Sequence, residues 1–205
     1  MSRSRQAALL ARHLSEVAEC DVQLVHETGA LWNVGWTDGP RREEMRDHLD
    51  AALTGHRYAE MRDRKISCWR SDSVRAWAAQ AIASRREGTL GPAIAEGAAY
   101  RRSLGVELHR VGVPDPSETH EYYALLRHIE DRCRATAYPD RAGAPEDEPL
   151  IAQLLAAGTR DRANIGRPTV SEFDMAKALL AAEQAPTGNQ PPKLTVVRAP
   201  AAADG

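Results

Sequence analysis

The sequence predicts a helix-rich α+β fold, with a small antiparallel sheet that has helices on one face, followed by a mostly helical half. Short β-rich runs occur mainly in the first third of the chain, and most later patterns have helical spacing. Composition agrees, because 35 of the 205 residues are Ala, the strongest helix former, whereas Phe173 is the only Phe. Helices packed closely through small side chains are therefore expected.

The first elements form the predicted sheet unit. Apolar residues at helical spacing predict a helix over residues 5–18, and two β-rich runs, 21–27 and 30–36, are joined by Thr28-Gly29 as in a hairpin. A second helix follows at 41–53, for which Asp38 is the predicted cap. Three residues alternate onto one strand face, which we expect to be core beneath the two helices: Trp32, Val34 and Trp36.

A third strand is predicted over residues 65–69, and Ser71-Asp72-Ser73 caps the next helix, which ends at Gly88. An Ala-rich helix is expected from Leu90 to Leu104. Gly105 is the predicted break after it, and Val106–Val111 is predicted to be another strand, because its side chains alternate.

Three further helices complete the prediction. The longest covers residues 118–137, and another runs from 150 to Gly158. In the last, Thr169 and Glu172 form a predicted capping box before an apolar face that includes Phe173. The expected buried stripe of the longest helix is Tyr122, Leu126, Ile129 and Cys133.

These elements suggest three regions. Residues 1–86 form a small α-β-β-α-β-α unit, residues 87–185 a mainly helical unit packed on it, and residues 186–205 a flexible tail rich in Pro, Gly and Ala. Within the tail, only Leu194–Val197 could add an edge strand.

Composition limits the class of protein. With 42% hydrophobic and 27% charged residues, the chain is typical of a folded, soluble protein. Three widely spaced Cys residues indicate no disulfide framework, and no apolar run approaches a membrane span, so a cytoplasmic protein without a membrane partner is expected. The 24 Arg against 3 Lys are typical of a GC-rich, actinobacterial-like genome.

No complete catalytic, phosphate-binding or metal-binding motif is present, so no cofactor and no metal are expected. His120-Glu121 begins like a zinc-protease helix, but position 124, which would need a second His, is Ala124. An acid–base pocket remains an alternative, in which carboxylates and imidazoles beside apolar faces would act together. Its candidate catalytic residues are Glu107, His109, Glu121 and His128.

The most distinctive charge pattern is a basic band. Residues 57–110 contain eleven Arg or Lys and only six acids, with aromatic residues between them, although the whole chain has a net charge of −2. Arginines with exposed aromatic rings bind nucleic-acid backbones and stack on bases. The alternative is that Trp69 and Trp77 are core and the arginines form ion pairs. The candidate contacts are Arg62, Arg64, Arg70, Arg101 and Arg102.

The sequence therefore favours a non-catalytic binding or regulatory accessory protein, with nucleic acid as the leading partner. An enzyme or small-molecule binder of an unrecognised family is the first alternative. A protein-interaction adaptor, docking through the acidic segment Pro145–Glu148 or an Ala-rich helix face, is the second.

Overall fold

The computed structural model describes residues 3–112, 119–160 and 169–184. By its internal contacts the chain divides into two compact units, Met1–Trp77 with Glu130–Gly143, and Ala78–Ile129 with Ala144–Gly205. The helix-rich α+β class is confirmed. The boundary expected between residues 86 and 87 stays a prediction, and the predicted tail lies outside the described residues.

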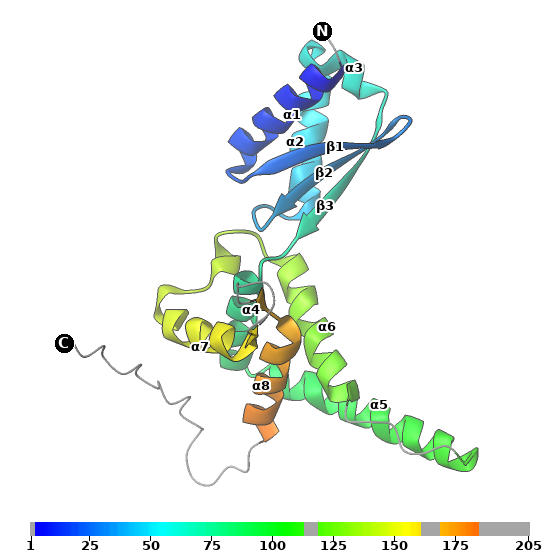
Figure 1. Cartoon of the computed structure of the whole chain (residues 1–205), viewed down its shortest axis with the longest axis vertical. Helices are drawn as coiled ribbons and strands as arrows, with labels where there is room; N and C mark the ends of the chain where they lie inside the picture. The colour runs from blue at the N-terminus through cyan, green and yellow to red at the C-terminus, as the bar shows by residue number, and fades with distance from the viewer. Residues whose placement is uncertain (1–2, 113–118, 161–168, 185–205) are drawn as a thin grey trace, which may run out of the picture. The chain divides into compact units, whose positions relative to one another are not determined.

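The first unit contains a three-stranded sheet (Figure 1). Its elements are α1 (Arg3–Ala18), β1 (Val22–Thr28), β2 (Leu31–Thr37), α2 (Arg42–Thr54), the 3-10 turn η1 (His56–Tyr58), α3 (Ala59–Arg62) and β3 (Lys65–Ser71). Strand β1 is antiparallel to β2, whereas β3 is parallel to β2. The predicted antiparallel arrangement is right for the hairpin only, because α2 and α3 provide the long crossover that parallel strands need.

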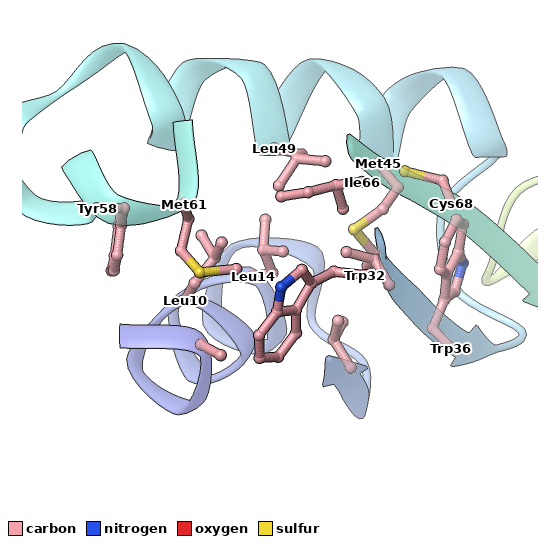
Figure 2. Close-up of a cluster of buried hydrophobic side chains, with 13 residues drawn as sticks. Leu10, Leu14, Trp32, Trp36, Met45, Leu49, Tyr58, Met61, Ile66 and Cys68 are labelled. Atoms are coloured by element: carbon pink, nitrogen blue, oxygen red, sulfur yellow. The ribbon is translucent and has the colours of Figure 1, made fainter. Parts of the chain in front are cut away.

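The core of this unit lies between the sheet and helices α1 and α2 (Figure 2). The prediction for β2 is confirmed, since Trp32, Val34 and Trp36 are only 9%, 0% and 3% exposed. They share one buried cluster with Leu10 of α1 and Met45 of α2. The alternating buried side chains of β2 therefore pack against the apolar faces of two helices, α1 before the hairpin and α2 after it.

Helix α2 begins differently from the prediction. Its N-terminal cap position is Arg41, whose backbone N–H donates to Oε2 of Glu44 at 2.7 Å. Hydrogen bonds from Arg41 also lower the pKa of Glu44 below its usual value. Asp38 instead accepts a hydrogen bond from the backbone N–H of Ser73 at 3.0 Å, so it connects the ends of two strands and does not cap α2.

The second unit is mostly helical. Helices α4 and α6 contribute residues to both units. The elements are α4 (Val74–Arg86), α5 (Leu90–Arg110), α6 (Thr119–Ala135), α7 (Glu148–Gly158), β4 (Thr159–Arg160), β5 (Thr169–Val170) and α8 (Glu172–Gln184). Helices α5 and α6 approach closely at Gly97, where a Cβ would lie 2.6 Å from the carbonyl oxygen of His120. Only glycine fits this position without a shift of the neighbouring backbone.

Helix α5 corrects the prediction of a strand at Val106–Val111. The helix continues through Gly105 and ends at Arg110. A mid-helix glycine costs only about 1 kcal/mol relative to alanine, which the rest of a 21-residue helix offsets. The pattern Val106–Val111 therefore does not form a sheet face.

The predicted stripe of α6 is confirmed, because Tyr122, Leu126, Ile129 and Cys133 are all buried. The start of α8 is different. Thr169 lies in β5, and the Ser171 carbonyl accepts the backbone N–H groups of Asp174 and Met175. Phe173, which the sequence places on the apolar face of this helix, is 50% exposed, and Met175, Ala176 and Leu179 form the buried face of α8.

Candidate functional site

The two faces of the sheet differ in what covers them. Along β3, Ile66 and Cys68 point toward the helices and are 7% and 3% exposed, whereas Trp69 is 73% exposed. Trp69 is the most exposed of the large hydrophobic side chains in the described residues. The alternative that it is core is therefore wrong for Trp69, although it holds for Trp77, which is 3% exposed.

We define the open face as the residues of the sheet that alternate away from the helices, up to the register shift that follows His26. They are Gln23, Val25, Leu31, Asn33, Gly35, Thr37, Lys65, Ser67, Trp69 and Ser71. All are half-buried or exposed, and none is buried. Of these ten residues only Lys65 is charged.

Strand register places Trp69 beside Gly35, which in turn pairs with Gln23. Polar side chains on either side of this row form hydrogen bonds with each other. The Ser67 hydroxyl donates to the Asn33 side-chain carbonyl, and the Thr37 and Ser71 hydroxyl oxygens lie 2.8 Å apart. The face therefore presents a large aromatic ring next to a glycine, which has no side chain. Lys65 is the one charged residue among its ten positions.

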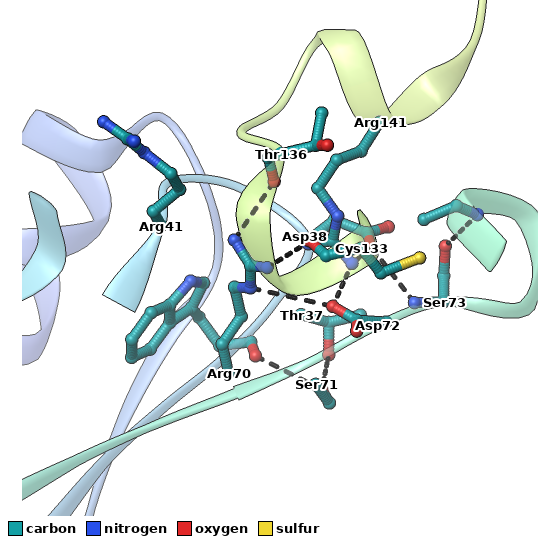
Figure 3. Close-up of polar contacts among 12 residues, drawn as sticks. Thr37, Asp38, Arg41, Arg70, Ser71, Asp72, Ser73, Cys133, Thr136 and Arg141 are labelled. Atoms are coloured by element: carbon teal, nitrogen blue, oxygen red, sulfur yellow. Dashed lines mark hydrogen bonds and ion pairs between the residues drawn. The ribbon is translucent and has the colours of Figure 1, made fainter. Parts of the chain in front are cut away.

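A largely buried ionic cluster holds the end of β3 (Figure 3). Arg70 points to the side opposite Trp69, and its side chain is only 5% exposed. Its guanidinium donates to the carbonyl oxygens of Pro40 at 3.3 Å, Thr136 at 3.2 Å and Cys133. Burial, together with the nearby positive charge of Arg141, lowers the pKa of Arg70 below its usual value.

Two aspartates complete this cluster, each directly after one of the two parallel strands. Arg141 is fully buried and donates to Asp72, and its Nη2 lies 3.3 Å from Oδ1 of Asp38. Asp38 has a φ of 56°, a backbone conformation that is unusual outside glycine. Burial raises the pKa of the Cys133 thiol in this cluster to about 12, so the thiol stays protonated near neutral pH.

The cluster contains two arginines and two aspartates, so its charges balance. Three of these residues lie at the ends of β2 and β3, and Arg141 comes from the later segment of the same unit. These ion pairs hold β3 in one register relative to β2. The register of a strand decides which of its side chains point away from the core. We therefore interpret the cluster as the support that keeps Trp69 on the open face.

The four candidate acid–base residues lie on helices α5 and α6. Glu107 and His109 lie in the last turns of α5 and are exposed, and Glu107 pairs with Arg110 at 3.3 Å. Glu121 is buried, and its Oε1 accepts a hydrogen bond from Nε of Arg101 at 2.9 Å. Because residues 106–110 are helical, the predicted strand face that would have paired Glu107 with His109 does not exist.

His128 has its own contact, with its Nε2 3.1 Å from the Thr89 hydroxyl oxygen. The acid–base pocket remains a prediction.

Most of the candidate nucleic-acid contacts donate hydrogen bonds within the chain. Arg62 donates to the carbonyl oxygens of Leu53 and Gly55 at the end of α2, at 3.1 and 2.9 Å. Arg64 donates to the Glu60 carbonyl at 3.4 Å. Arg70 belongs to the buried cluster and Arg101 pairs with Glu121, whereas Arg102 is exposed.

A small cavity lies between α4, α7 and α8 of the second unit. Its volume is about 40 Å³, and its walls include Ile82, Leu154 and Leu179 with Arg85 and Gln153. Pockets that bind drug-sized ligands measure about 300–1,000 Å³. This cavity is too small for such a ligand.

The described residues contain no group of three or more His, Cys, Asp or Glu residues that could hold a metal ion. In the same part of the chain, no helix combines the length and the apolar character that crossing a bilayer requires. Comparison with known proteins adds no relative, since no family model, no curated protein and no solved structure matches this chain.

Proposed function

We propose that the chain is a non-catalytic binding protein that recognises another protein through the open face of its sheet. One observation carries the proposal: Trp69 is 73% exposed on a strand whose other face is core. Tryptophan is among the residues most enriched in the hot spots of protein interfaces. An uncovered tryptophan on the face of a sheet exposes apolar area to water unless a partner covers it.

The low charge of the open face supports a protein as the partner. The centres of protein interfaces are depleted in charged residues, and this face has Lys65 alone among ten positions in a chain with 27% charged residues. Nucleic-acid binding would instead need several cations facing the phosphates. Fewer cations of the basic band are available to contact phosphates, because four of its guanidinium groups already hydrogen-bond within the chain. They belong to Arg62, Arg64, Arg70 and Arg101.

Photo-crosslinking tests this proposal. A benzophenone amino acid replaces Gln23, an exposed residue of the open face, in the full chain expressed in the cells that make it. The control carries the same probe at Asp47, an exposed residue of α2 on the opposite side of the sheet. We expect a protease-sensitive adduct from the Gln23 probe, and its loss when Trp69→Ala is added.

The outcomes separate the candidate partners. A nuclease-sensitive adduct at Gln23 would restore the nucleic-acid hypothesis. Equal adducts at Gln23 and Asp47, or no adduct at either, would show that the open face is not a recognition surface.

A further inference from the structure

We infer that the open face accepts a single amphipathic α-helix from the partner protein, about four turns long. This inference rests on the proposed function and specifies its partner. It follows from the size of the face, from its chemistry, and from how helices pack on the other face of the same sheet.

The size of the face excludes a stable dimer of two copies through this surface alone. Strands are spaced by about 4.8 Å and rise about 3.3 Å per residue, so three strands of seven residues cover roughly 14 by 23 Å, or on the order of 300 Å². A stable interface buries about 800 Å² on each partner. The open face provides less than half of that area.

A helix matches the same dimensions. An α-helix with its side chains is about 10–12 Å wide and rises 1.5 Å per residue, so roughly 15 residues would cover the length of the strands. The opposite face already shows this kind of packing, because Trp32 and Val34 of β2 share a cluster with Leu14 of α1 and Leu49 of α2. A helix on the open face would give the sheet the common arrangement of helices on both sides.

The chemistry of the face favours a helix over an added strand. A strand bonds to the edge of a sheet and would leave the Trp69 ring uncovered, since that ring stands on the face. On the edge strand β3, the Ile66 carbonyl already accepts a hydrogen bond from Arg46 at 3.3 Å. A helix lying across the face would instead cover Trp69, Val25 and Leu31 together.

These features define the partner segment. It has apolar residues at helical spacing i, i+3, i+4 and i+7, and an acidic residue near one end that faces Lys65. Because the contact is small, we expect transient binding, with a dissociation constant on the order of micromolar or weaker.

Selection from two peptide display libraries tests the inference. Both contain 16-residue peptides of the same composition, with apolar positions at helical spacing in one and strictly alternating in the other. The bait is the full chain, with counter-selection on the Trp69→Ala variant. We expect enrichment from the helical library alone, and at least tenfold weaker binding of the enriched peptides to Trp69→Ala and to Val25→Arg.

The control bait is Asp47→Ala, which changes an exposed residue of α2 and should bind like the unmodified chain. Circular dichroism of each variant confirms that it is folded. Enrichment from the alternating library, or no enrichment that depends on Trp69, would overturn the helix inference. So would a Trp69-dependent dimer in sedimentation, or Trp69-dependent binding of oligo(dT) with no helical enrichment.

Failure of this inference is distinguishable from failure of the proposed function. A protease-sensitive adduct at Gln23 without helical enrichment leaves the binding surface intact and rejects only the helix. Absence of both results rejects the recognition surface itself.

Discussion

Trp32 and Trp69 lie in neighbouring strands of one sheet, yet they have opposite environments. Trp32 is 9% exposed within the core, whereas Trp69 is 73% exposed on the open face. The difference comes from the pleat, because successive side chains of a strand point to opposite faces. A ring that is mostly exposed contributes little to the stability of its unit. Trp32 should therefore affect stability, and Trp69 should affect binding.

Replacing each ring by Ala should show this separation. We expect Trp32→Ala to lower the free energy of unfolding by about 3–5 kcal/mol, because a large buried side chain is lost and a cavity remains. Trp69→Ala should change it by no more than about 0.5 kcal/mol. Urea unfolding followed by circular dichroism measures both, and a large loss with Trp69→Ala would mean that the ring is part of a packed core.

The same pair shows what the sequence could predict at the residue scale. The alternation of Trp32, Val34 and Trp36 was enough to predict their burial. A comparable signal existed for Trp69, since Ile66 and Cys68 share one face of β3 and Trp69 must then point to the other. Composition alone favours a buried tryptophan, and whether anything covers the second face of a sheet depends on packing that a single strand does not encode.

Strand β3 is held in place at its end by the cluster of Arg70, Asp38, Asp72 and Arg141. These charges lie in a largely buried environment, where removing one partner leaves the others unpaired at a high free-energy cost. Arg141 has no exposed side-chain area, so its guanidinium is the most deeply buried group of the set. The cluster joins residues far apart in the sequence, which is why no local pattern predicted it.

Arg141→Leu should therefore be strongly destabilising. It leaves the carboxylates of Asp38 and Asp72 without their shared guanidinium, at an expected cost of about 3–5 kcal/mol. The matched control is Arg134→Leu, which removes exposed ion pairs with Glu130 and Asp131 and should cost at most about 1 kcal/mol. Chemical denaturation gives both values, and equal effects of the two substitutions would contradict the role of the cluster.

Helix α5 explains where the sequence-based prediction of elements went wrong. Gly105 and the alternation in Val106–Val111 both indicated a strand, but Leu90, Gly97 and Leu104 are spaced by seven residues, which is two helical turns. That period ends at Leu104, directly before the supposed break, so it gave no signal that the helix continues to Arg110. Alternation over six residues is a weak signal, and the continuing helix satisfies its own backbone hydrogen bonds without a neighbouring strand.

At the scale of the whole molecule, charge along the sequence and charge available at the surface are different quantities. The band at residues 57–110 has eleven basic residues and six acidic ones. Within it, Arg85 pairs with Glu183 and Arg86 with Asp147, which belong to the acidic later part of the chain. These ion pairs, formed on folding, therefore neutralise part of the excess positive charge of residues 57–110.

This argument gives an expectation for nucleic acid that a titration can check. Labelled single-stranded DNA and RNA are titrated with the full chain at two salt concentrations. If few guanidinium groups reach phosphates, binding should be no tighter than about 10⁻⁴ M at physiological salt, with a salt slope of at most about two. The slope, and not the affinity at one salt concentration, counts the phosphate contacts.

Two single substitutions test which arginines contact phosphate. Arg102→Ala removes an exposed cation and should lower any salt slope by about one, equally for all sequences. Arg101→Ala should act mainly on stability, because it leaves the buried Glu121 carboxylate, whose side chain is only 5% exposed, without its partner. A steep salt slope that falls with Arg62→Ala and Arg64→Ala would show that these guanidinium groups leave their carbonyl partners to bind phosphate, and the basic band would then replace the open face as the recognition surface.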